Sequence, residues 1–146
     1  MRCLDVDADD DPDIIACNYW GPIFWLECPE KPEHQTWRFH LVDDEVKGIH
    51  GIDLGDIDRD GKIDLVANSA QTGKIGESIV WYKIPHGSDT VRNWRRYILG
   101  RGNEKGGTHY PRLADIDHDG DLDGVIGSKH GHWFAWWACP FGYGRL

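Results

Sequence analysis

A short acidic segment occurs three times in this chain, and its repetition constrains the fold more than any other feature. The copies read DVDADDDPD from Asp5, DIDRDGKID from Asp56 and DIDHDGDLD from Asp115. They recur at intervals of about 50–60 residues, which is typical of architectures that stack one supersecondary unit on the next. We therefore expect three repeat units within a single segment, 1–146, at approximately 1–45, 46–103 and 104–146.

Short runs rich in β-branched and aromatic residues follow each acidic segment and predict strands. The first run occupies 14–20, 63–69 and 122–128, the second 23–29, 79–85 and 133–140, and a Trp-led third run 36–42 and 93–99. No helical periodicity is present in these runs. The sequence therefore predicts an all-β protein of about three four-stranded antiparallel repeats, which are β-propeller blades.

The predicted ring is incomplete. Propellers usually close with about four to eight blades, and the third unit stops after its third predicted strand. Either the chain is a segment of a longer propeller, or copies of it complete one ring by oligomerisation. We favour the first explanation, because terminal blades left uncovered would present exposed strand edges.

The acidic segments have the composition of a cation-binding loop. Aspartates at the first, third, fifth and ninth positions gather carboxylates around one point, and the backbone carbonyl of the seventh position adds another oxygen. Such a flexible, oxygen-rich shell suits Ca²⁺, and without a cation the carboxylates would repel one another. We therefore expect up to three bound Ca²⁺ ions, one in each loop.

The predicted ligands share these loop positions, with the seventh position acting through its backbone. They are Asp5, Asp7, Asp9, Asp11 and Asp13 in the first loop, Asp56, Asp58, Asp60, Lys62 and Asp64 in the second, and Asp115, Asp117, Asp119, Asp121 and Asp123 in the third. In the first loop Asp10 replaces the glycine of the sixth position and Pro12 stiffens the eighth. Aspartate tolerates a left-handed backbone, so the turn is feasible there, but we expect this site to be the weakest.

An EF-hand also begins with aspartates at these positions, but it requires a glutamate at the twelfth position and flanking helices. Here the twelfth position is Ala16, Ala67 or Ile126, and strands are predicted on both sides. The segments DIDRDGKIDLV and DIDHDGDLDGVIG instead resemble the core of FG-GAP/VCBS repeats, which form blades of integrin-α-like propellers. The preceding GIHGIDLGD and the following IVWYKIP fit the same pattern.

This resemblance covers nearly the whole chain. It implies that each acidic loop joins the first two strands of a blade and binds Ca²⁺ there. It also implies an extracellular or cell-surface location, although the N-terminal sequence shows no apolar region of a signal peptide.

Two histidines occupy equivalent places, each six residues before the first aspartate of a loop: His50 and His109. In a propeller this position lies near the rim of the central channel, where Tyr110, Arg112 and Lys129 are also expected. Such a cluster could bind an acidic sugar or abstract its proton, and the resemblance extends to polysaccharide lyases and a sugar dehydratase. We favour the alternative, a repeated structural contact between blades, because a fold alone does not imply a reaction.

Eight tryptophans raise a further interpretation, the stacking of carbohydrate on exposed rings. Those at matching places in the units are expected to pack between blades: Trp25, Trp37, Trp81, Trp94 and Trp136. The less regular ones are expected to be exposed: Trp20, Trp133 and Trp137. The cysteines Cys3, Cys17, Cys28 and Cys139 lack zinc-ligand spacing and are expected to be buried thiols, with a Cys3–Cys17 bridge as the alternative.

The net charge of −9 is concentrated in the acidic segments, which hold six, four and five of the 25 acidic residues. Three divalent cations would reduce it to about −3. Nucleic-acid binding is disfavoured because there is no basic stripe, and no apolar run is long enough for a membrane span. We expect a calcium-binding module for carbohydrate or protein ligands. The alternatives are part of a polysaccharide lyase or sugar-modifying enzyme, and a self-assembling repeat protein.

Overall fold

The computed structural model describes residues 1–70, 78–85, 93–101, 108–128 and 134–138, which contain eleven strands and no helix. The first sheet consists of β1 (Arg2–Leu4), β2 (Asp13–Cys17), β3 (Ile23–Glu27) and β4 (Arg38–Asp43). The second consists of β5 (Ile52–Gly55), β6 (Asp64–Ser69), β7 (Ser78–Lys83) and β8 (Arg95–Arg101). The third consists of β9 (Thr108–Ala114), β10 (Asp123–Ser128) and β11 (Phe134–Trp137).

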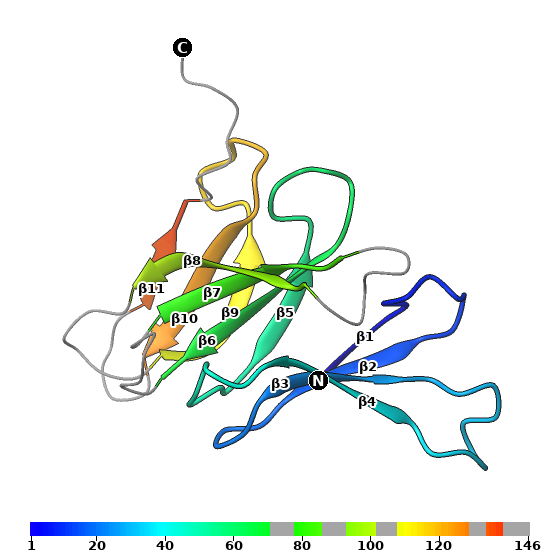
Figure 1. The fold of residues 1–146 in the computed structure, drawn as a ribbon. Coiled ribbons are helices and arrows are strands. Elements are labelled where there is room, and N and C mark those ends of the chain that lie inside the picture. The colour runs from blue at the N-terminus through cyan, green and yellow to red at the C-terminus, as the bar shows by residue number, and fades with distance from the viewer. Residues whose placement is uncertain (71–77, 86–92, 102–107, 129–133, 139–146) are drawn as a thin grey trace.

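Within every sheet the strands follow one another in chain order and pair antiparallel. Figure 1 shows the second sheet lying between the first and the third. The prediction of an all-β protein with antiparallel units of about four strands is thus confirmed for the described residues. Among those residues no helix is long and apolar enough to cross a membrane.

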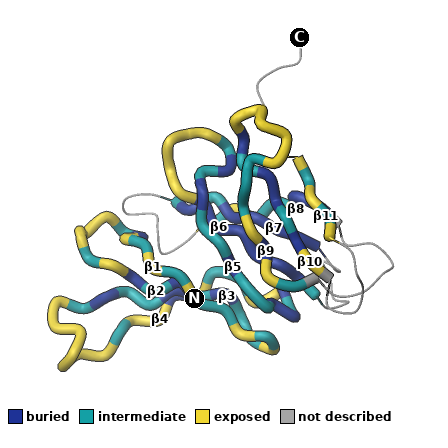
Figure 2. The backbone as a smooth tube through the Cα atoms, turned by 180° about the vertical axis from the view of Figure 1, so that it is seen from behind, coloured by how far each residue is buried: buried dark blue, intermediate teal, exposed yellow. Residues whose placement is uncertain are grey.

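The second sheet is buried on both faces, and it separates two apolar cores. All six residues of β6 are buried, and Figure 2 shows buried backbone concentrated in β6 and β7. The first core joins the first two sheets and contains Ile15, Ile23, Trp25, Leu65, Ala67, Val80 and Tyr82. The second core contains Val66, Ile79, Trp81 and Leu99, with Leu113 and Trp137 of the third sheet packed against them. Successive residues of a strand point to opposite faces, so adjacent residues of β6 and β7 enter different cores.

The tryptophan predictions are confirmed in part. Trp25 and Trp81 are fully buried, Trp94 packs against the first core, and Trp20 is 74% exposed as expected. The last two described tryptophans are the reverse of the prediction: Trp136 is 38% exposed, whereas Trp137 packs against the second core. In β11, Trp137 pairs with Gly124 and its neighbour necessarily faces the other way. Trp37 is half-buried and its indole N–H donates to Pro32, and Trp133 lies outside the described residues.

The three described cysteines are free thiols, so the alternative of a Cys3–Cys17 bridge is wrong. Cys28 is buried as expected, but Cys17 is only half-buried and Cys3 is exposed. Cys3 is exposed because it faces away from Leu4, its neighbour in β1, which packs against the first core. Cys139 lies outside the described residues.

Candidate metal centres

Each acidic loop joins the first two strands of a sheet: β1 to β2, β5 to β6, and β9 to β10. The first aspartate of the loop follows one strand directly, and the ninth begins the next. Antiparallel pairing places these strand ends side by side, through the pairs Leu4–Asp13, Gly55–Asp64 and Ala114–Asp123. The hairpin itself therefore brings distant loop positions together.

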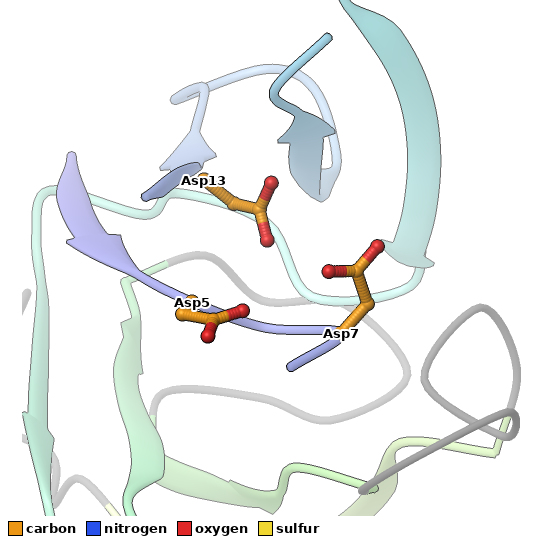
Figure 3. Close-up of side chains that lie close together, drawn as sticks. All are labelled: Asp5, Asp7 and Asp13. Atoms are coloured by element: carbon orange, nitrogen blue, oxygen red, sulfur yellow. The ribbon is translucent and has the colours of Figure 1, made fainter. Parts of the chain in front are cut away.

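Three carboxylates meet in every loop, those of the first, third and ninth positions. One oxygen from each lies within 4.8 Å of the others in the triads Asp5–Asp7–Asp13, Asp56–Asp58–Asp64 and Asp115–Asp117–Asp123. Figure 3 shows the carboxylates of the first triad turned toward a common space. The ninth-position aspartate is buried in all three loops, while the other two members are more accessible. The predicted grouping of these nine residues is thus present.

The same hydrogen bonds shape all three loops. The ninth-position carboxylate accepts the backbone N–H of the second position at 2.9, 3.1 and 2.9 Å in the first, second and third loops. The first-position carboxylate accepts the N–H of the sixth at 3.1, 2.9 and 3.1 Å. The fifth-position carboxylate accepts the N–H of the seventh at 3.0, 3.0 and 2.9 Å. Such aspartate turns fold the backbone around the carboxylates.

The fifth-position carboxylates lie outside the three triads. Asp9, Asp60 and Asp119 each hold the seventh amide, a structural role that the spacing did not indicate. Their role as ligands stays a prediction, as does that of the seventh-position carbonyls of Asp11, Lys62 and Asp121.

Two residues of each loop adopt the left-handed backbone region. The sixth position was expected to do so, and Asp10 has φ 72° beside φ 83° for Gly61 and 91° for Gly120. The aspartate therefore replaces glycine without changing the turn. The fourth position is also left-handed, with φ 65° at Ala8, 58° at Arg59 and 60° at His118. The sequence carries no signal for it, because these residues share no chemical property that favours positive φ.

Each triad contains a buried carboxylate oxygen that makes no hydrogen bond. These atoms are Oδ1 of Asp7, Oδ1 of Asp58 and Oδ1 of Asp115. Burying a charged oxygen without a partner is costly, and a cation placed among the three carboxylates would satisfy it. The set consists of oxygens only, which matches a hard divalent cation rather than a thiolate- or imidazole-seeking metal.

The pKa values of the triads indicate the same need for positive charge. Burial raises the pKa of Asp64 to about 6, with Asp58 and Asp60 adding repulsion. Burial also raises the pKa of Asp13 above its usual value, and burial followed by the charge of Asp13 raises that of Asp7. A carboxyl group whose charged form is disfavoured in this way gains most from a bound cation.

The second loop differs from the others because a lysine reaches it. The ammonium of Lys83, the last residue of β7, contacts Asp58 and lies 2.8 Å from Oδ2 of Asp60. Hydrogen bonds to Asp58 and Asp60 raise the pKa of Lys83, and the bond to Lys83 lowers that of Asp60. Sequence reasoning missed this residue, although Lys83 stands where IFWLECP has Glu27.

The two candidate catalytic histidines are in contact. The rings of His50 and His109 stack with centroids 3.6 Å apart and planes 20° from parallel. Tyr110 lies 5.7 Å from the His109 ring and is 60% exposed. On the other side, Tyr19 lies 4.9 Å from His50 and 4.7 Å from Trp20. This aromatic row runs from the first sheet toward the third, at the ends of β5 and β9 opposite the acidic loops.

Two further residues were catalytic candidates, Arg112 and Lys129. Arg112 donates from its guanidinium to the carbonyl of Pro111, and Lys129 lies outside the described residues. The stacked rings supply a contact between the second and third sheets, in line with the structural role that we favoured. A catalytic role for His50, His109 or Tyr110 stays a prediction.

None of three comparisons with known proteins found a match, whether with protein-family models, with curated proteins or with solved structures.

Proposed function

We propose that this chain is a β-repeat module stabilised by calcium, in which Ca²⁺ bound in an acidic loop stabilises the first hairpin of its sheet. The observation that carries the proposal is the recurrence of one carboxylate triad in three loops, each with an unpartnered buried oxygen. Ca²⁺ is favoured over Mg²⁺ because it accepts more oxygen ligands in less regular geometry. The backbone carbonyls of a left-handed loop can supply such additional ligands.

The three sheets are, in this proposal, consecutive propeller blades. Two properties support it: the strand order is the same in each sheet, and the second sheet buries both faces against its neighbours. The cation acts on the hairpin that begins each blade, so it stabilises the unit from which the stack is built.

The module serves to bind or to scaffold, with carbohydrate or a protein surface as the ligand class and an extracellular setting. Support comes from the aromatic row, whose two ends, Trp20 and Tyr110, are 74% and 60% exposed. Exposed indole and phenol rings offer flat apolar area with a polar edge, which suits sugar rings and protein interfaces.

Removal and return of the cation test the proposal. A chelator is expected to lower the melting temperature of the intact chain, and Ca²⁺ in excess is expected to restore it. The variants Asp13→Asn and Asp123→Asn should each remove one bound Ca²⁺ in equilibrium dialysis. Asp44→Asn, which changes an exposed acid outside the loops, should leave the number unchanged. A melting temperature indifferent to both chelator and Ca²⁺ would refute the proposal.

A second candidate function, self-assembly, is favoured by the outer faces of the stack. His40 stacks on Trp25 of the first core, so its neighbours Phe39 and Leu41 face away from that core and are 54% and 50% exposed. On the third sheet, Phe134 and Trp136 are 74% and 38% exposed. Their counterparts in the second sheet, Ile79 and Trp81, are 0% and 1% exposed.

Inside the molecule, the equivalents of these two faces pack against each other between neighbouring sheets. A second copy of the chain could therefore continue the stack head to tail. The mass in solution, measured by light scattering over a range of concentrations, tests this. Trp136→Arg is expected to reduce association, whereas Trp20→Arg, an exposed tryptophan outside these faces, is not. A chain that stays monomeric at all concentrations would exclude self-assembly.

A further inference from the structure

A positively charged side chain is built into the second acidic loop. Lys83 lies one residue beyond the Leu65–Tyr82 pair, so the strand register places it opposite Asp64 of the triad. Its ammonium contacts Oδ2 of Asp58 and lies 2.8 Å from Oδ2 of Asp60. One carboxylate of the triad is therefore already paired with a cation that belongs to the chain.

This ion pair changes what a metal ion would meet in the second loop. A divalent cation bound by the triad would share Asp58 with the ammonium, and two positive charges that close together repel one another. The ion must displace Lys83 or bind in its presence, and either route reduces the free energy of binding. The side chain of Lys83 is 38% exposed, so it has solvent available if it is displaced.

The other loops carry no such lysine at this place. The three sheets can be aligned on equivalent strand pairs, which are Ile15–Trp25, Val66–Trp81 and Val125–Trp136. The residues two positions after these tryptophans are Glu27, Lys83 and Ala138, respectively. At this position in the sheet, the side chain is thus negative in the first unit, positive in the second and uncharged in the third. Glu27 accepts from His40 at 2.6 Å, yet it still adds to the negative field at Asp7.

We propose that Lys83 is an intrinsic counter-cation of the second loop, which makes this loop the weakest of the three Ca²⁺ sites. The inference rests on the proposed function, since it ranks sites that the function assumes. It replaces the expectation that the first loop is weakest: Asp10 adopts the left-handed turn of the glycines, so the substitution at the sixth position carries no visible cost. In the absence of Ca²⁺, Lys83 holds the second loop together.

Calcium titration of the intact chain separates this idea from the function it rests on. By isothermal titration calorimetry, the wild type should show two tighter sites and one about tenfold weaker or more. Asp58→Asn should abolish the weaker site and leave the tighter two. Lys83→Met should bring the third site to the affinity of the others, whereas Lys31→Met, which changes an exposed lysine outside the loops, should not.

A measurement without metal provides a second readout. In chelator, Lys83→Met should melt at a lower temperature than wild type, because Asp58 and Asp60 lose their partner; Ca²⁺ should then restore more stability than it does in wild type. Three equal sites in the wild type, or loss of a tight site in Asp58→Asn, would overturn the role of Lys83 while leaving the calcium proposal intact. Absence of Ca²⁺ binding at every loop would instead overturn the proposed function, and the ranking with it.

Discussion

The guanidinium of Arg59 donates a hydrogen bond to Asp121 at 2.9 Å, joining the second acidic loop to the third across 62 residues of chain. Arg59 stands at the left-handed fourth position of its loop. The side chain of Asp121 is only 3% exposed and its Oδ2 has no hydrogen-bond partner. The ion pair therefore couples the two loops, because the buried carboxylate of Asp121 would be destabilising without a partner.

Replacing Arg59 by alanine is expected to lower the free energy of unfolding by about 1–2 kcal/mol. The reason is the unpaired carboxylate left at Asp121, and the value is moderate because the side chain of Arg59 is 44% exposed. Urea denaturation measures the change. Adding Asp121→Asn to the variant should recover part of the loss, and Lys62→Ala in the same loop should cost little. Equal stability of Arg59→Ala and wild type would show that the pair contributes nothing.

A second polar contact ties the first sheet to the second. The hydroxyl of Tyr82 donates to Oδ2 of Asp43 at 2.9 Å, and the same carboxylate is paired with Arg96. Tyr82 is fully buried, so its ring belongs to the first core while its oxygen reaches the end of β4. Burial, followed by the negative charge of Asp43, raises the pKa of Tyr82 above its usual value.

This contact predicts an alkaline loss of stability. The folded chain keeps the Tyr82 proton at a pH where the unfolded chain loses it, so stability falls as pH rises above about 10. Tyr82→Phe should cost about 1–2 kcal/mol near neutral pH, because a hydrogen bond to a charged group is lost. It should also flatten the alkaline fall, measured as the free energy of unfolding between about pH 8 and 11. Tyr110→Phe, which changes a tyrosine at the surface, is the matched control.

Much of the fold could be predicted because the repeat supplied the same signal three times. The predicted runs at 63–69 and 122–128 correspond to β6 and β10, and the acidic hairpins lie where the spacing placed them. Strand faces were harder to predict: exchanging Trp136 with Trp137 is a shift of one residue, which moves a side chain to the opposite face. Nothing in a short aromatic run distinguishes these two registers.

The candidate site was predicted less completely, because its distinctive contacts reach each loop from another part of the chain. Lys83 reaches the second loop from the end of β7, and Arg59 reaches the third loop from the neighbouring unit. Neither contact follows from the spacing of the loop residues alone. The one available signal was the difference between Glu27 and Lys83 at matching places. That difference can be interpreted only with the register of β7 against β6, which places Lys83 opposite Asp64.

A close approach between sheets predicts a sharp steric effect at Gly100. A Cβ atom there would lie 2.3 Å from the indole ring of Trp137, which packs flat over this residue from the third sheet. Gly100→Ala is therefore expected to destabilise the chain by about 1–3 kcal/mol, because the ring must move out of a packed core. Thermal melting checks the value. Gly127→Ala, where a Cβ atom meets nothing within 4 Å, should melt close to wild type; equal melting of the two variants would contradict the packing.

The stack of His50 on His109 predicts that these rings stabilise the contact between the second and third sheets. A double-mutant cycle with His50→Ala and His109→Ala should give a coupling free energy of about 0.5–1.5 kcal/mol, the usual contribution of an aromatic pair. His50→Phe should retain most of the stability, since a flat ring can still stack. The enzymatic alternative predicts a different pattern: turnover of uronate-containing glycans that His50→Phe abolishes without loss of stability. Such activity would show that the imidazole itself is needed, whereas retention of function with phenylalanine at this position would leave the stack as a structural contact.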